Sequence, residues 1–234
     1  MRILAAPVQR SSLHEIIVTQ LREMILDGRL APGTSVPELD LCRDLDISRT
    51  PLREALKVLA AEELVRLLPN RGAVVSEIVP EEIAEIFEVV EGLERLIGHL
   101  VVERASEADV AEIRGLYERL VGLKESGDKH AYFDLNQATH RRLAEMTRNR
   151  VLTAGYAGYS DKIRRARWLA NLSATRWSES VREHAAFTEA LERRDGEALS
   201  RLLAEHAHHT GVAVIAALRA LPAAETTARR RRRS

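Results

Sequence analysis

Three cations recur at four-residue spacing in the first quarter of the chain. Arg49, Arg53 and Lys57 stand at i, i+4 and i+8, so on a helix their side chains share one face. Leu52 and Leu56 lie on the adjoining arc, where they can pack onto other elements. Arginine can bind guanine O6 and N7 in the major groove, and both cation types bind phosphate. This pattern predicts a helix that reads DNA; a solvated charged face is the alternative.

Other residues extend this predicted DNA-reading surface. The helix begins at a Ser-Arg-Thr sequence, and a basic residue, Arg71, precedes a flexible glycine, Gly72, at a predicted hairpin turn. From there Arg71 could reach the DNA backbone or the minor groove. The predicted DNA-binding residues are Arg43, Ser48, Arg49, Thr50, Arg53, Lys57, Arg71 and Gly72.

A second group of residues suits metal chemistry. Asn136 and His140 are spaced i, i+4, and His184 and His206 align with the apolar positions of their own predicted helices. A buried polar group needs a partner, and three imidazoles with an amide oxygen could hold a divalent metal ion such as Zn or Ni. The alternative is that each histidine is an ordinary core residue with a hydrogen-bonded neighbour.

The elements that must position the cations are three short helices and a hairpin. The first helix is expected to begin at Ser12, with Glu15 at capping-box spacing, and to end near Gly28. The expected elements after it are a helix over 38–45, a helix from Ser48 to about 61 with Pro51 in its first turn, and strands at 64–68 and 73–76. Three helices followed by a hairpin are the order of a winged helix-turn-helix.

The histidines fall in a region without strand signals. Helices are expected at about 80–104, 107–125, 128–147, 150–171, 176–193 and 196–219. Six helices with short loops predict an antiparallel bundle. The expected fold is mostly α, with a winged helix-turn-helix domain at 10–78, a helical domain at 79–221 and a disordered basic tail at 222–234.

Composition excludes several classes of protein. No apolar run approaches the roughly 20 residues that span a bilayer, and the N-terminus lacks the apolar core of a secretory signal. A single cysteine, Cys42, excludes an internal disulfide framework and fits a reducing cytoplasm. The formal net charge is zero, so DNA binding must come from a local cationic cluster. The tail Arg229 to Arg233 could add phosphate contacts, or it could be a solvated terminus.

The N-terminal motifs resemble the GntR family of bacterial regulators. The resemblance covers 13–76 and is carried by 28–33 (GRLAPG), 45–56 (LDISRTPLREAL), 59–65 (LAAEELV) and 69–75 (PNRGAVV). It implies recognition by Arg49, Thr50 and Arg53, a wing contact near Arg71, and a homodimer on a palindromic operator. Asp46 stands where the family usually turns on Gly, and Asp tolerates the left-handed conformation.

Residues 80–219 resemble the FCD (FadR C-terminal domain) type of effector domain. Many members bind metal through an Asp or Asn, a His four residues later and two further His, which implies Asn136, His140, His184 and His206 here. Six helices place the domain nearer the shorter, VanR-like branch. The family often has Arg where this chain has Val90, so a carboxylate effector would need another cation; the candidates are Arg95, Arg164, Arg165 and Arg167.

Together these observations predict a cytoplasmic homodimeric regulator, by default a repressor, that senses a small organic acid. Val79-Pro80 is the expected hinge between its domains. Two rivals stay open at this point. One is a metalloenzyme with a three-histidine site. This alternative is weakened because we find no carboxylate placed as a general base. The other is an architectural or partner-binding protein whose histidines are structural.

Overall fold

The computed structural model describes residues 13–69, 71–170 and 173–221. The chain divides into two compact units, with the boundary between Ile78 and Val79. No helix in the described part of the chain is both long and apolar enough to cross a membrane.

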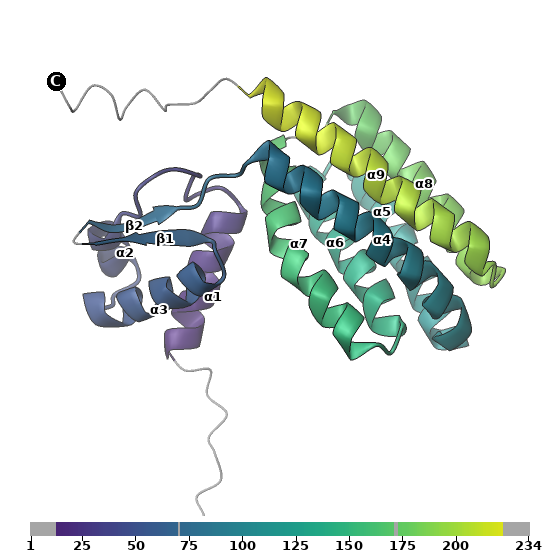
Figure 1. The fold of residues 1–234 in the computed structure, drawn as a ribbon, viewed down its shortest axis with the longest axis horizontal. Coiled ribbons are helices and arrows are strands. Elements are labelled where there is room, and N and C mark those ends of the chain that lie inside the picture. Colours follow the sequence, from purple (N-terminus) through teal and green to yellow (C-terminus); the bar gives the residue numbers. More distant parts are fainter. Residues whose placement is uncertain (1–12, 70, 171–172, 222–234) are drawn as a thin grey trace, which may run out of the picture. The chain divides into compact units, whose positions relative to one another are not determined.

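The first unit has the predicted order of three helices and a hairpin (Figure 1). Its elements are α1 Leu13–Leu26, α2 Glu38–Asp44, α3 Arg49–Ala61, β1 Val65–Leu68 and β2 Gly72–Val75. The strands are antiparallel, with Val65 opposite Val75 and Leu68 opposite Gly72. The winged helix-turn-helix prediction is therefore confirmed, with β2 starting one residue earlier than expected.

Residues 33–36, for which the sequence predicted no strand, also pair with the hairpin. Gly33 donates a backbone hydrogen bond to Val75 (2.9 Å), and Val36 donates one to Ala73 (2.9 Å). Ser35 forms an isolated antiparallel bridge with Val74. Four residues without alternating polarity are too short a strand signal to detect from sequence. Their pairing gives β2 a backbone partner on both sides.

Two positions with positive φ shape the turns of this unit. Gly28 has φ +75° just after α1, as expected for a helix that ends on glycine. Asp46 has φ +51° in the turn between α2 and α3, which confirms that Asp takes the left-handed conformation there. These turns set the directions in which α2 and α3 leave their connections.

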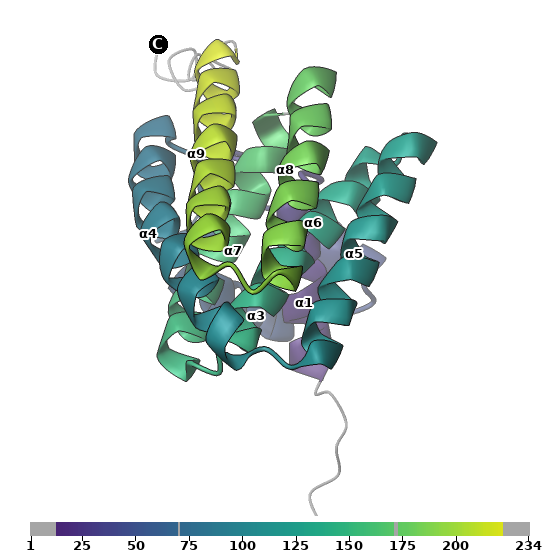
Figure 2. The same cartoon turned by 90° about the vertical axis from the view of Figure 1, so that its right-hand side faces the viewer.

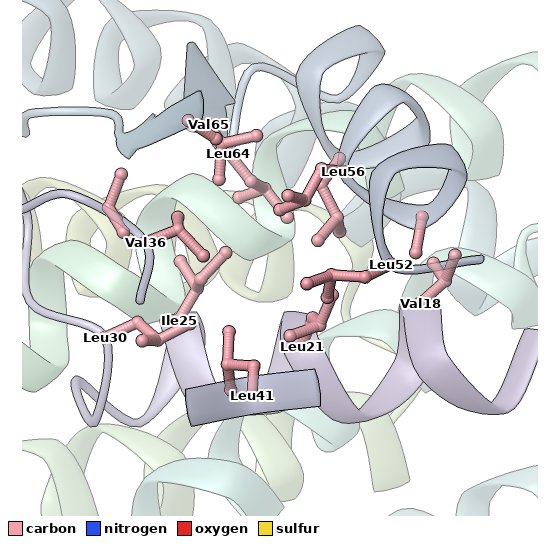
Figure 3. Close-up of a cluster of buried hydrophobic side chains, with 14 of the residues drawn as sticks. Val18, Leu21, Ile25, Leu30, Val36, Leu41, Leu52, Leu56, Leu64 and Val65 are labelled. Carbon is pink, nitrogen blue, oxygen red and sulfur yellow. The ribbon is translucent and has the colours of Figure 1, made fainter. Parts of the chain in front are cut away.

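One apolar cluster holds the first unit together (Figure 3). Leu21 of α1 and Leu52 of α3 are fully buried in it, as is Val75 of β2. Loop residues Leu30 and Val36 also pack into the cluster. Because helices and hairpin contribute to the same core, α3 is held along its apolar side.

The second unit is the predicted bundle of six helices, counted over its described residues. They are α4 Pro80–Arg104, α5 Glu107–Ser126, α6 Lys129–Met146, α7 Arg150–Ala170, α8 Ala174–Glu192 and α9 Gly196–Ala220. Ser106 and Asp109 form the expected capping box at α5, and Asp128 and Asp195 cap α6 and α9. α8 starts two residues before the predicted position because Ser173 accepts a hydrogen bond from the Arg176 N–H.

α4 and α9 pack closely along their length, side by side in both views (Figures 1 and 2). A Cβ built on Gly98 of α4 would lie 2.4 Å from the Ser200 Cα of α9. Ser200 Oγ donates a hydrogen bond to the Arg95 carbonyl oxygen at 2.7 Å. The missing side chain at Gly98 therefore allows the two backbones to approach.

Some predictions fall outside the described residues. These are the Ser12 half of the first capping box, the turn residue Asn70, the end of the helix predicted to reach residue 171, and the basic tail at 222–234.

We expect Gly98→Ala to destabilise the helical unit by roughly 1–3 kcal/mol, since its methyl group would meet the α9 backbone. The matched control is Gly92→Ala on the same helix, where an added Cβ has nothing within 4 Å. That change should stabilise α4 by up to ~1 kcal/mol. Urea unfolding followed by tryptophan fluorescence measures both, because Trp168 and Trp177 both lie in this unit. Equal effects of the two substitutions would contradict the close approach of α4 and α9 at Gly98.

Candidate nucleic-acid interface and candidate metal centre

The cationic edge of α3 is exposed to solvent. Leu52 and Leu59 on the opposite side are fully buried in the core of the first unit. The N-cap Ser48 has extended backbone, with ψ 168°, so the helix begins at Arg49, one residue after the predicted start at Ser48. The predicted residues Arg43, Ser48, Arg49, Thr50, Arg53, Lys57 and Arg71 are all exposed, and Gly72 is half-buried.

A groove between α2, α3 and the hairpin brings several of these residues together. Arg49, Arg53 and Lys57 line it from α3, and Arg71 and Gly72 line it from the turn of the hairpin. Its remaining lining includes Leu67 and two acidic residues of α2, Glu38 and Asp40. Arg43, Ser48 and Thr50 are exposed but do not line the groove.

The cations of this surface differ in their ion pairs. Arg53 Nε lies 3.4 Å from Glu38 Oε2, and Lys57 Nζ lies 2.7 Å from Glu54 Oε1. These cations are more than half exposed, and exposed pairs contribute little to stability, so phosphate could replace their partners. Arg49 has no ion pair with any residue described by the structure, which leaves its guanidinium available for a base edge.

Gly72 is required by its surroundings as well as by its conformation. Its φ is +75°, and a Cβ at this position would lie 2.6 Å from Glu38 Oε1. The turn of the hairpin therefore packs against the first turn of α2. A side chain at position 72 would be strained by this φ, and the flexible Glu38 carboxylate would have to move aside.

The three predicted ligand histidines meet in the bundle. His140 of α6, His184 of α8 and His206 of α9 each offer a ligand nitrogen, and these nitrogens lie within 4.8 Å of one another. All three side chains are buried, with His184 fully so. His208 and His209 lie outside the cluster, where they contact Glu91 and Glu183 at the surface.

Asn136 lies beside the histidines, but its amide oxygen is engaged. Its Nδ2 is 2.7 Å from His184 Nε2, and its Oδ1 accepts a 2.6 Å hydrogen bond from Arg167. For Oδ1 to bind a metal ion, the amide would have to turn over and release Arg167. The assignment of Asn136 as a ligand stays a prediction.

The structure adds a carboxylate that sequence reasoning missed. Glu94 of α4 is 1% exposed, and its Oε1 lies 2.9 Å from His140 Nδ1. Tyr156 donates a 2.7 Å hydrogen bond to the same oxygen. Sequence reasoning had found no carboxylate placed as a general base, and it did not anticipate one beside His140. The available signal was the helical register of Glu94 with Val90, Ile97 and Val101, all buried.

A second carboxylate contacts another histidine of the cluster. Glu183 Oε2 lies 2.7 Å from His206 Nδ1. The buried Arg176 donates hydrogen bonds to both Glu183 oxygens, at 3.0 and 2.6 Å, and a further one to Thr210. Sequence reasoning missed Arg176 because a single arginine at an interior register position has no distinctive spacing.

The four candidate effector cations separate clearly. Arg95 is exposed, and Arg164 forms an ion pair with Asp134 at 3.0 Å. Arg165 and Arg167 are both buried, but the histidine cluster is contacted by Arg167, through Asn136. Burial lowers the pKa of Arg167 to about 10, so it remains a cation at neutral pH.

His184 and His206 are held in the neutral form that can bind a metal ion. Burial first, and then repulsion from the neighbouring imidazoles, lower the pKa of His184 and His206 well below 6.5. Neutral imidazoles have free lone pairs, which metal binding requires. His140 Nε2 and His184 Nδ1 are buried and have no hydrogen-bond partner among the described residues. The donor set therefore fits a divalent ion.

These lowered pKa values predict that the metal-free helical unit loses stability in acid. In the unfolded chain both histidines titrate near 6.5, so below that pH the unfolded state binds protons that the folded state does not. The stability is present above pH ~6.5 and is lost as pH falls, by up to ~1.4 kcal/mol per pH unit for each imidazole. Urea unfolding with a chelator, followed by tryptophan fluorescence at several pH values, measures it.

The exposed His99 provides a control for this pH dependence. His184→Gln should weaken the loss of stability between neutral pH and pH ~5, whereas His99→Gln should leave it unchanged. A wild-type unfolding free energy that does not change across this range would contradict the expectation.

Comparisons with known families match both units of the chain. Residues 13–75 match the model for bacterial regulatory proteins, gntR family. Residues 85–209 match the model for the FCD domain. Each match falls within one of the two units.

Individual relatives agree with the family models. An uncharacterized HTH-type transcriptional regulator of Bacillus subtilis is 26% identical over 191 residues, covering 81% of this chain and 85% of the relative. The gluconate operon transcriptional repressor of the same species is 33% identical over 130 residues, covering 55% of this chain and 53% of the repressor. The solved structure of E. coli McbR/YncC has a TM-score of 0.77 at 23% identity, covering 89% of this chain and 99% of that one.

Proposed function

The chain belongs to the gntR family of bacterial regulatory proteins and carries an FCD domain, and we propose how it binds DNA and senses a ligand. It is a DNA-binding transcriptional regulator. The relatives are transcriptional regulators and not enzymes, which removes the metalloenzyme alternative. Because it acts on bacterial DNA, we place it in the cytoplasm.

We propose that α3 enters the major groove with its N-terminal residues at base edges. One observation carries this proposal: Arg49, Arg53 and Lys57 form an exposed edge on a helix whose other side is fixed in a core. Arg49 has the role of reading a base, and Lys57 that of contacting phosphate. Arg71, at the turn of the hairpin, contacts the backbone or the minor groove.

Recognition in this proposal uses two copies of the chain. Helix-turn-helix dimers bind half-sites about one DNA turn apart, ~34 Å, and their two-fold symmetry matches a palindromic operator. We assign dimerisation to the helical domain, since it contains most of the chain. Its six helices favour the shorter, VanR-like branch of the FCD proteins.

We propose that His140, His184 and His206 hold a divalent metal ion, Zn or Ni. What supports this is the convergence of three buried imidazoles, of which His140 and His184 have ring nitrogens without a hydrogen-bond partner among the described residues. A bound ion would supply a positive centre for an anionic ligand. Asn136 is the proposed fourth ligand. Its hydrogen bond with Arg167 would break when the metal ion binds.

The effector in this proposal is a small carboxylate. Arg167 is the proposed cation that replaces the family arginine absent at Val90, because it is buried and one hydrogen bond away from the cluster. A carboxylate that takes Arg167 from Asn136 would change the contacts of α6 and α7. Its different affinity for two arrangements of the protein would shift the population away from the one that binds the operator. The regulator is then a repressor released by its ligand.

Arg49→Ala tests the DNA-reading surface. We expect it to lose ~1–3 kcal/mol of discrimination, about 5- to 150-fold in affinity for the operator, with little change on unrelated DNA. The operator can be selected from a random duplex library with the wild-type protein, and binding measured by fluorescence anisotropy at fixed salt. Arg29→Ala is the control, because Arg29 is exposed in the same unit but does not line the groove. Equal losses for both variants would exclude a reading role.

His184→Ala tests the metal centre. The protein is purified without chelator, and its metal content is measured by mass spectrometry, before and after incubation with Zn²⁺ or Ni²⁺. We expect wild type to retain about one ion per chain and the variant to retain none, with the DNA affinity of the metal-free proteins equal. The control is His208→Ala, which removes an exposed imidazole of α9. A variant with wild-type metal content would refute the site.

A further inference from the structure

Glu94 is an unexpected feature of the bundle interior, since it is a carboxylate with 1% exposure. Burying a carboxylate is costly unless other groups compensate its charge and its hydrogen bonds. Glu94 Oε1 contacts the Tyr156 hydroxyl and His140 Nδ1, but Oε2 has no partner among the described residues. A purely structural position would favour an apolar residue, as at Val90, Ile97 and Val101 on the same buried face of α4.

We propose that Glu94 is a positioning residue that orients His140 for metal binding. The proposal rests on the metal site proposed above. An imidazole binds a metal ion through one nitrogen, while its other N–H donates to a carboxylate, a carbonyl or water. Glu94 lies 2.9 Å from His140 Nδ1 and so selects that nitrogen as the donor. Neither ring nitrogen of His140 has a hydrogen-bond partner among the described residues, but Nδ1 is the one beside the carboxylate, so Nε2 is left for the ion.

The proposal requires the contact between Glu94 and His140 to change its alignment. Nδ1 and Oε1 are close enough for an ion pair, yet they do not meet hydrogen-bond geometry. A small rotation of the His140 ring would align them. Tyr156 holds Glu94 Oε1 from α7 at 2.7 Å, so the carboxylate is fixed while the ring turns.

The contacts of His206 repeat the arrangement on the other side of the cluster. Its Nδ1 lies 2.7 Å from Glu183 Oε2, and Arg176 fixes that carboxylate through two hydrogen bonds. Two of the three histidines therefore have a carboxylate at Nδ1, and each carboxylate is held by a buried residue. The third, His184, has the Asn136 amide at Nε2 instead.

The charge of Glu94 has a further consequence in this chain. The metal-binding pattern that it resembles has Asp or Asn at the first position, and here Asn136 brings no negative charge. Glu94 is on a different helix, α4, and places a negative charge directly behind His140. A carboxylate in that position makes the imidazole a stronger donor and so raises metal affinity.

The deciding experiment measures Zn²⁺ affinity of the full chain by competition with a chromophoric chelator. We expect Glu94→Gln to weaken binding about 10- to 100-fold, since the amide keeps the shape but loses the charge. Glu91→Gln is the matched control: it makes the same change on the same helix, and Glu91 also contacts an imidazole Nδ1, that of His208, at 2.9 Å, but near the surface. It should bind Zn²⁺ as wild type does.

Two readouts separate positioning from a structural role. The urea midpoint of metal-free Glu94→Gln should not fall, because a buried charge has been removed. The nitrogen chemical shifts of His140 in ¹⁵N-labelled metal-free protein should report the Nδ1–H tautomer in wild type and a mixture in Glu94→Gln. The wild-type spectrum tests the proposal even if that variant fails to fold.

The outcomes distinguish this proposal from the metal site itself. If wild type binds Zn²⁺ and Glu94→Gln binds it equally well, the positioning role is overturned and the metal site stands. An Nε2–H tautomer of His140 in wild type would also overturn it. If neither protein binds Zn²⁺ or Ni²⁺, the proposed metal centre fails, and with it the inference.

Discussion

Removing polar side chains from water is the constraint around which the helical unit is organised. Three imidazoles, three guanidinium groups and the carboxylates of Glu94 and Asp109 are buried in one bundle. Each needs a partner from a different helix, because residues on one helix face are too few to satisfy all of them. Contacts such as Tyr156 to Glu94 and Arg167 to Asn136 therefore fix how α4, α6 and α7 pack. The same contacts leave some atoms unpartnered, and that deficit is what a ligand can satisfy.

The DNA-binding unit meets a different requirement, which concerns the two sides of α3. One side of α3 must be fixed in the core, and the other must stay exposed for DNA. Its sequence therefore places apolar residues on one side and cationic residues on the other, at helical spacing. Leu52 and Leu59 anchor it, while Arg49 and Arg53 stay in solvent. Pairing of 33–36 with β2 extends the hairpin, so the strand that follows Arg71 has a backbone partner on both edges.

A structural feature could be predicted from the sequence where it depends on residues close together in the chain. Helix limits, the capping box at Ser106 and the left-handed Asp46 depend on neighbouring residues, and they were predicted. The histidines were found because each keeps its helical register. Glu94 and Arg176 were missed because their meaning depends on which helix faces which, and that is not encoded in spacing. The short pairing segment at 33–36 was missed for a similar reason, since its partner is almost forty residues away.

α4 is one uninterrupted helix from Pro80, the second residue after the boundary between the units, to Arg104. Fourteen residues separate Pro80 from Glu94, about 21 Å of helix at the usual rise per residue. The contact of Gly98 with the α9 backbone prevents α4 from bending away there. The carboxylate beside His140 and the first turn after the boundary therefore belong to one continuous hydrogen-bonded element. A ligand that displaced α4 at Glu94 would act on the same helix that starts at Pro80.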